Sequence, residues 1–480
     1  MPFSKKRFVA AFVAISLTAG LCSALPSCKK QPSAIVDDCL IEVEYADGKI
    51  FGKSTYTLTN RGDNPFDDVR FNLYANAYRK GAKYSPVEEK KKADVFKGGY
   101  GGITVEYARA DGNDAAYEIC GEDDNILSVK TDEYFPDEKI TVEVGFTTVL
   151  PSANLRLGKT SSTINLADFY PVPCKIENGE RVECLYSPFG DPYYSDVTDY
   201  SVSLTVPSAY TVAASGYPEK TTVDGEKTTY EYSLRRGRDF ACVLSENFEV
   251  CAARVGDVTV TAYSAKGRQE KASEIASDAL AYFTKTFGEF PYKCLSIAET
   301  PFMCGGMEYS GLCYIADNLD DGTSEYAILH EVAHQWWHGG VGNDQINAAY
   351  IDEGLAEFSV WLYLTENGRK SDADAMAENA KSTYKAYFDL YKTLGGEANT
   401  CMQRPLDEFS SVNEYVAVSY DKSLLAFTAY ADAVGLAKTK RNLKKLYETN
   451  LFGNISLTDI TSVMGLKEHF ISFVDGKVLI

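Results

Sequence analysis

The chain has 480 residues, which is too long for one hydrophobic core, so two or three domains are expected. Hydrophobic residues make up 45% of the chain and charged residues 24%; these ordinary globular values exclude a mainly disordered or multi-pass membrane protein. The net charge of −20 repels phosphate groups, so nucleic acid is not expected as a partner.

The first 28 residues have the pattern of an export signal. A positive segment at residues 5–7 precedes an apolar run at 8–25. Leu25-Pro26-Ser27-Cys28 resembles a bacterial lipobox, in which the cysteine is lipidated after cleavage. We therefore expect a signal peptide over 1–28, a short linker over 29–38, and an extracytoplasmic lipoprotein anchored to the membrane at Cys28. Simple secretion and an uncleaved anchor are the alternatives.

Residues 39–254 alternate apolar and polar side chains in short runs that turn residues separate. The runs at 41–45, 140–144 and 200–206 have the period of two that is typical of half-buried strands. We expect an N-terminal all-β domain over 39–254. Within it, Cys174 and Cys184 flank a hairpin-turn sequence, which permits either a disulfide or two buried thiols.

The pattern changes after residue 255. Apolar residues at helical spacing predict helices at 271–287, 325–337, 353–364, 372–394 and 422–434, with a strand before Gly305. Residues 255–480 are therefore predicted to form an α-rich domain. Because no low-complexity linker separates the two halves, we expect a substantial interface between them.

Three of the four histidines, at positions 330, 334 and 338, lie within nine residues. His330-Glu331-Val332-Ala333-His334 is an H-E-x-x-H motif on a predicted helix, where residues four apart share a face, so both imidazoles can hold one zinc ion. Glu331 projects at an adjacent angle and can take a proton from a water molecule. A helix whose histidines make only structural contacts is the alternative.

A zinc site of this kind needs a third ligand. His338 shares the helical face, but eight residues from His330 correspond to about 12 Å of rise, too far for one ion, so it is expected at the helix end. Glu353 begins the next predicted helix, nineteen residues after His334, and is the predicted third ligand. Glu357, one turn later, is either an acceptor that orients a ligand histidine or an exposed carboxylate.

H-E-x-x-H followed after eighteen residues by Glu, and preceded by Gly305-Gly306-Met307-Glu308, resembles zinc aminopeptidases of the aminopeptidase N and leukotriene hydrolase type, a gluzincin family. Segments 190–194, 212–216 and 287–292 are similar to the same family, so the resemblance covers 39–480. It implies a saddle-like β domain followed by a thermolysin-like zinc peptidase domain, with one zinc ion per chain.

The resemblance also implies roles for individual residues. Glu308 would bind the free α-amine of the substrate, and Tyr309 stands where the family often has Asn, which alters the contacts around the amine. The backbone of Gly305 and Gly306 would approach an extended substrate closely. Tyr420, 67 residues after Glu353 and followed by Asp421-Lys422, would stabilise the developing oxyanion. Tyr415 is a second tyrosine that is expected to line the site.

These expectations combine into an exported aminopeptidase that removes N-terminal residues from peptides. A gluzincin endopeptidase and a non-catalytic surface protein of the same fold are the alternatives. Only 60 residues follow Tyr420, so a two-domain protein with an open groove is expected.

Overall fold

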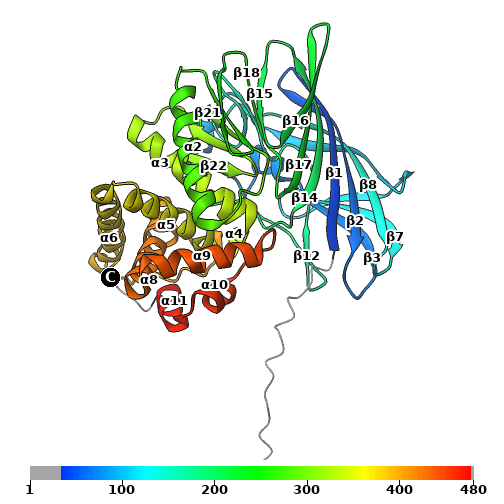
Figure 1. The fold of residues 1–480 in the computed structure, drawn as a ribbon. Helices are drawn as coiled ribbons and strands as arrows, with labels where there is room; N and C mark the ends of the chain where they lie inside the picture. Colours follow the sequence, from blue (N-terminus) through cyan, green and yellow to red (C-terminus); the bar gives the residue numbers. More distant parts are fainter. Residues whose placement is uncertain (1–33, 477–480) are drawn as a thin grey trace, which may run out of the picture. The chain divides into compact units, whose positions relative to one another are not determined.

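The computed structural model describes residues 34–476, which include a β-rich N-terminal part and an α-rich C-terminal part, as predicted (Figure 1). The expected signal peptide and the lipidated Cys28 lie outside the described residues. Within them, no helix has both the length and the apolar character needed to cross a bilayer.

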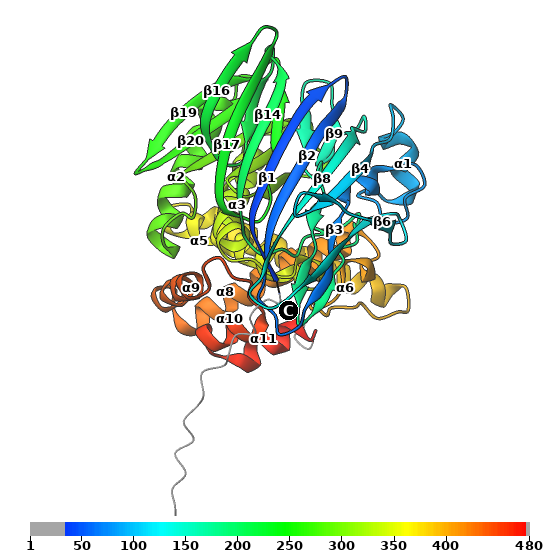
Figure 2. The same cartoon turned by 90° about the vertical axis from the view of Figure 1, so that its right-hand side faces the viewer.

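One large sheet dominates the β-rich part, and its strands run in the order β16-β17-β14-β1-β2-β8-β4-β5, with β12 and β13 attached through β1 (Figure 2). The three predicted strand runs lie in β1, β8 and β14, where alternate residues such as Ile41 and Val43 are buried. The strands of this sheet are β1 (Ala34–Ala46), β2 (Lys49–Asn60), β4 (Gly102–Ala110), β5 (Asn113–Asp114), β8 (Lys139–Val149), β12 (Lys175–Glu177), β13 (Glu180–Val182), β14 (Thr198–Pro207), β16 (Tyr217–Asp224) and β17 (Lys227–Gly237).

Two smaller sheets complete the β-rich part, with strand orders β15-β18-β10-β9 and β11-β3-β7-β6. Their strands are β3 (Phe66–Asn72), β6 (Tyr117–Cys120), β7 (Ile126–Tyr134), β9 (Leu157–Lys159), β10 (Ile164–Leu166), β11 (Val172–Pro173), β15 (Thr211–Ala214) and β18 (Cys242–Ser245). A short helix, α1 (Glu89–Val95), lies outside them. Cys174 and Cys184 are both buried free thiols in this region, which corresponds to the second of the two alternatives.

The C-terminal part begins with a five-stranded sheet in the order β19-β20-β21-β23-β22. Its strands are β19 (Glu249–Val255), β20 (Val258–Ser264), β21 (Cys294–Thr300), β22 (Gly306–Tyr309) and β23 (Leu312–Ala316). β22 is the edge strand, and it pairs antiparallel with β23. This position leaves one side of β22 free to face the helices.

The helices of the C-terminal part share one apolar core with this sheet. They are α2 (Gln269–Phe287), α3 (Asp321–His334), the π-helix η2 (Gln335–Gly340), α4 (Gln345–Ala348), α5 (Tyr350–Glu366), α6 (Lys370–Thr393), α7 (Val412–Tyr415), the π-helix η4 (Val416–Asp421), α8 (Lys422–Val434), α9 (Leu436–Asn450), α10 (Leu457–Met464) and α11 (Lys467–Val474). The five predicted helices correspond to α2, α3 with η2, α5, α6 and α8. Asp320 caps α3, because its carboxylate accepts hydrogen bonds from the backbone of Gly322 and Thr323.

The β-rich part also holds the end of α3 in place. Arg238, at the end of the large sheet, is buried, and its Nε donates to the carbonyl oxygen of His338 at 2.5 Å. Asp239 lies 3.2 Å from His338 Nε2 and accepts from the backbone N–H of Ser310 at 2.8 Å. A small apolar cluster, which includes Ala213 from β15 and Met307 from β22, closes the same junction. The two parts therefore share an interface directly behind the motif helix.

Candidate metal centre and its surroundings

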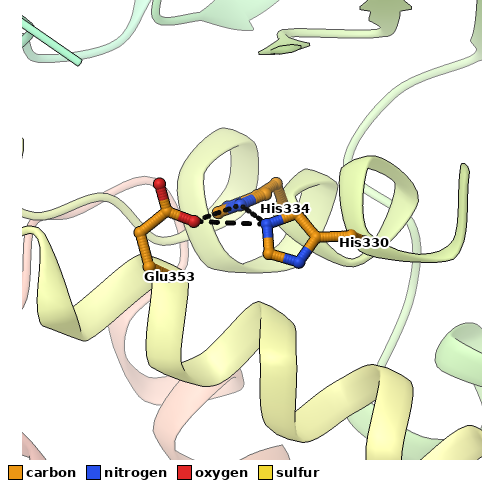
Figure 3. Close-up of side chains that lie close together, drawn as sticks. All are labelled: His330, His334 and Glu353. Atoms are coloured by element: carbon orange, nitrogen blue, oxygen red, sulfur yellow. Dashed lines mark hydrogen bonds and ion pairs between the residues drawn. The ribbon is translucent and has the colours of Figure 1, made fainter. Parts of the chain in front are cut away.

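Two helices bring the three predicted metal ligands together. His330 and His334 project from one face of α3 toward Glu353 in the first turn of α5 (Figure 3). The Nε2 atoms of the two histidines are 3.0 Å apart, and they lie 3.2 Å and 3.3 Å from Glu353 Oε2. We call these three residues the zinc cluster.

The spacing of the three donor atoms suits a zinc ion. Ligands at about 2.0 to 2.1 Å from a tetrahedral zinc lie about 3.3 Å from one another. All three side chains are buried, and their donor types, two imidazoles and a carboxylate, are those of catalytic zinc sites. Burial disfavours the charged form of Glu353, yet hydrogen bonds with His330 and His334 hold the pKa of this carboxyl well below its usual range. The residues present therefore fit zinc.

A second carboxylate stands behind His330. Glu357 Oε1 lies 3.0 Å from His330 Nδ1, and Glu357 also accepts a hydrogen bond from the hydroxyl of Tyr326. Because Nδ1 of His330 faces an acceptor, its Nε2 atom is left to face the other two residues of the zinc cluster with its lone pair. Glu357 is buried, so of the two roles considered for it, the structure has the orienting acceptor rather than the exposed carboxylate.

Glu331 lies between the zinc cluster and strand β22. Its carboxylate is within 4.8 Å of ligand atoms of His334 and Glu308, and its Oε2 has no hydrogen-bond partner. Burial raises the pKa of Glu331 to about 8; His330 opposes this shift and the negative charge of Glu308 adds to it. A β-carbon on Gly306 would overlap the Glu331 carboxylate, so Gly306 allows the strand to approach this acid.

Glu308 itself takes part in a second group of buried polar residues that the sequence did not predict. Gln345, on the short helix α4, donates from Nε2 to Glu308 Oε1 at 3.0 Å and to Asp352 Oδ2 at 2.7 Å. Asn343 donates to Asp352 Oδ1 at 2.8 Å. We call Glu308, Gln345 and Asp352 the Glu308 cluster.

His338 also reaches the Glu308 cluster. One of its ring nitrogens lies within 4.8 Å of oxygens of Glu308 and Asp352. The helix after His334 continues as the π-helix η2, which is wider than an α-helix and carries His338 toward the Glu308 cluster. His338 stays outside the zinc cluster, as predicted from its axial distance, but it is buried in the site.

The two predicted tyrosines on η4 and α7 line the zinc cluster. The Tyr420 hydroxyl donates to Glu353, and the Tyr420 ring stacks on His330 with centroids 5.8 Å apart. Tyr415 packs edge-on against Tyr420, and its buried hydroxyl has no partner. Burial raises the pKa of both phenols far above the ordinary value, and the charge of Glu353 adds to the shift, so both stay protonated donors.

Two other predicted residues lie on or next to β22. Tyr309 follows Glu308 along β22 and so points to the opposite face, where its ring packs against Tyr314. The structure therefore does not bring the Tyr309 side chain to the Glu308 cluster. Gly305 precedes β22, and its carbonyl accepts from Ala316 N at 3.0 Å.

The β-rich part contributes a further buried acid that the sequence did not predict. Asp191 is buried and pairs with Arg156, which is half-buried. Burial raises the pKa of Asp191 to about 7; Arg156 opposes the shift, while Glu308, Glu353 and other acids add to it. The region around the zinc cluster is therefore strongly negative.

Comparisons with known proteins agree with this geometry. The family model described as the Peptidase family M1 domain matches residues 271–474. Aminopeptidase 2 of Candida albicans is 30% identical over 120 residues, which cover 22% of this chain and 13% of that relative. The chain thus matches only a small part of the length of this relative.

Solved structures match over most of the chain. The M1 zinc metallopeptidase of Deinococcus radiodurans has a TM-score of 0.67 at 18% identity, over 94% of this chain and 96% of that one. A mutant of it bound to a Tyr-Ser-Ala substrate has a TM-score of 0.63 at 17% identity, over 93% and 96%. At this identity the likeness establishes the fold. Because the family model covers the segment that carries the zinc cluster, Glu308 and both tyrosines, residues 271–474 of this chain form a domain of peptidase family M1.

Proposed function

We propose that this protein is a zinc-dependent aminopeptidase that removes N-terminal residues from peptides. The observation that carries the proposal is the position of Glu308, a buried carboxylate directly beside Glu331 and the zinc cluster. A carboxylate one residue away from the scissile bond pairs with an α-ammonium group, which only the end of a peptide provides. The Deinococcus structure with a bound tripeptide supports peptides as the substrate class.

In this proposal each residue has a defined task. His330, His334 and Glu353 would hold zinc, which when bound supplies Lewis-acid polarisation of the scissile carbonyl group. Glu331 takes a proton from the attacking water on its carboxylate and delivers it to the nitrogen of the leaving amine. The Tyr420 hydroxyl turns from Glu353 to donate to the substrate oxygen on which negative charge develops. Glu308 fixes the N-terminus, so that the first peptide bond is the one presented to Glu331.

The test compares peptides that differ only at the N-terminus. A panel of tripeptides and their N-acetylated forms is incubated with the zinc-loaded protein, and cleavage is followed by mass spectrometry. We expect release of the first residue from the free peptides and at least about 100-fold slower cleavage of the acetylated ones, since the charge-assisted contact with Glu308 is lost. Equal rates on both would instead indicate an endopeptidase. No hydrolysis by fully loaded protein would indicate a non-catalytic binding protein.

We also propose that the protein is exported and anchored by a lipid at Cys28, on the N-terminal sequence pattern alone. Metabolic labelling with a fatty acid and membrane fractionation test this. The wild type should be labelled and sediment with membranes, while Cys28→Ala should be unlabelled. An unlabelled wild type found in the culture medium would indicate simple secretion.

A further inference from the structure

The Glu308 cluster has more negative charge than the described protein compensates. Glu308 and Asp352 are both buried, and their carboxylate oxygens approach within 4.8 Å. Within residues 34–476, no ion pair joins a Lys or Arg to either carboxylate, and the nearby Arg156 is paired with Asp191. His338 has a ring nitrogen within 4.8 Å of both carboxylates, but its Nε2 also faces a third acid, Asp239, at 3.2 Å. Two buried carboxylates so close together are costly unless a positive group lies between or beside them.

The amide of Gln345 leaves one acceptor unused at the same place. Both neighbours of its Nε2 are carboxylates, at 3.0 Å on Glu308 and 2.7 Å on Asp352, so its N–H groups are fully used. Its Oε1 is buried and accepts no hydrogen bond. A buried carbonyl oxygen without a donor is unfavourable unless a ligand supplies one.

Gln345 cannot turn to relieve this, because the two carboxylates fix its orientation. If the amide were reversed, its oxygen would face both carboxylates and two N–H···O bonds would be lost. Asp352 is fixed in turn by Asn343, and it lies in the first turn of α5 next to Glu353, the predicted metal ligand. The unused oxygen of Gln345 is therefore a rigid feature of the site.

We infer that Gln345 Oε1 and the Glu308 carboxylate together bind the primary ammonium group of the substrate, and that Asp352 positions Gln345 and supplies a second negative charge. An ammonium group carries three N–H donors and no acceptor, so it matches this set of acceptors. This inference rests on the proposed function, because it names the further residues that read the N-terminus in the same site. It makes Gln345 a specificity residue and Asp352 a positioning residue.

The experiment uses full-length, zinc-loaded Gln345→Met, which keeps the length of the side chain and removes both the donors and the oxygen. On the tripeptide that the wild type cleaves fastest, we expect KM to rise about 10- to 100-fold, as for a lost hydrogen bond to a charged group, with a smaller change in kcat. The residual rate on the N-acetylated peptide should be unchanged. The control, Gln403→Met, removes an amide that contacts Tyr350 and Asn347 instead, and should keep the wild-type KM.

Zinc content and melting temperature are measured on every variant. Should Gln345→Met lose zinc or fold poorly, Asp352→Asn takes its place. Its amide oxygen can still accept from Gln345, while its NH2 group replaces the oxygen that accepted from Asn343, and the negative charge is lost. We expect a rise in KM of about 3- to 10-fold. An unchanged KM, or equal losses on free and acetylated peptides, would overturn the inference while the wild type's preference for free N-termini still supports the proposed function. A second divalent ion in the wild type, lost in Asp352→Asn, would also overturn it, because the cluster would then be a metal site.

Discussion

The zinc cluster and the Glu308 cluster are neighbours in one domain, but they are assembled differently. The zinc cluster takes two of its three residues from a single helix, four positions apart, and the third from the next long helix. The Glu308 cluster takes one residue each from an edge strand, a four-residue helix and the first turn of α5. The first depends mainly on helix geometry, and the second on how separate elements pack.

This difference also appears in how the buried charges are satisfied. In the zinc cluster, the donors face one another at ligand spacing, and Glu357 lies 3.0 Å from His330 Nδ1. In the Glu308 cluster, amide groups hold the carboxylates and leave one oxygen unused. In the proposed function, the first cluster would hold a zinc ion and the second would bind the ammonium group of the substrate.

Glu331 stands between the two clusters, and its substitution should have the largest effect. Glu331→Gln removes the only proposed proton acceptor at the reacting water, so kcat should fall about 10²- to 10⁴-fold while zinc content stays the same. Steady-state kinetics and metal analysis check this. Glu325→Gln is the matched control on α3, because Glu325 pairs with Arg369 away from the site. Full activity in Glu331→Gln would contradict the assigned base.

A substitution on β22 tests how closely the Glu308 strand must approach the motif helix. In Gly306→Ala the added β-carbon overlaps the Glu331 carboxylate, so we expect kcat to fall about 10- to 100-fold with zinc retained. In Gly305→Ala the added carbon meets no atom within 4 Å, so the loss should be far smaller. Equal losses in both variants would show that general backbone stiffness, and not contact with Glu331, is responsible.

A substitution of Glu357 tests whether zinc binding depends on the carboxylate that faces His330 Nδ1. Glu357→Gln weakens the acceptor at His330 Nδ1, and zinc affinity should fall about 10-fold or somewhat more. Competition with a chelating dye measures this. Glu366→Gln, on the same helix but paired with Lys440, should bind zinc as the wild type does. An unchanged zinc affinity in Glu357→Gln would mean that zinc binding depends on the three direct ligands alone.

Asp168 gives a reference for a buried carboxylate outside both clusters. It accepts hydrogen bonds from the hydroxyls of Tyr186 and Tyr193, and burial raises its pKa to about 6 although Arg156 opposes the shift. The pKa of an Asp carboxyl in the unfolded chain is about 3.9, so between these two pKa values the folded state binds more protons than the unfolded state. The stability that protonated Asp168 contributes is therefore present below about pH 4 and is lost as the pH rises through 6.

Asp168→Asn should remove that dependence. Relative to the wild type, the variant should gain up to about 2 kcal/mol in the free energy of unfolding between pH 4 and pH 8. Urea unfolding at both pH values measures the difference. Asp257→Asn, in the exposed turn between β19 and β20, serves as the control. A constant difference between Asp168→Asn and wild type at the two pH values would mean that the tyrosine hydroxyls fully compensate the buried charge.

Local patterns predicted much of this fold. The alternation at 41–45, 140–144 and 200–206 lies in real strands, and the helix predicted at 422–434 has the bounds of α8. Helices α9, α10 and α11 were not predicted, and η2 extends the motif helix in a wider form than the α-helix assumed there. The boundary between residues 254 and 255 stays a prediction, although β19 already pairs within the five-stranded sheet.

The zinc cluster could be predicted from sequence spacing, because two histidines four apart on a helix must share a face, and Glu353 begins the next predicted helix, where the chain can return to the ion. The Glu308 cluster and the positions of Asp191 and His338 could be seen only once the packing of distant segments was known. No local period relates Gln345 to Glu308, which lies 37 residues away on an edge strand, and the π-helix between them departs from the regular spacing of an α-helix. Contacts of this kind depend on the packing of whole elements, and that packing is the sum of many weak interactions that no short motif records.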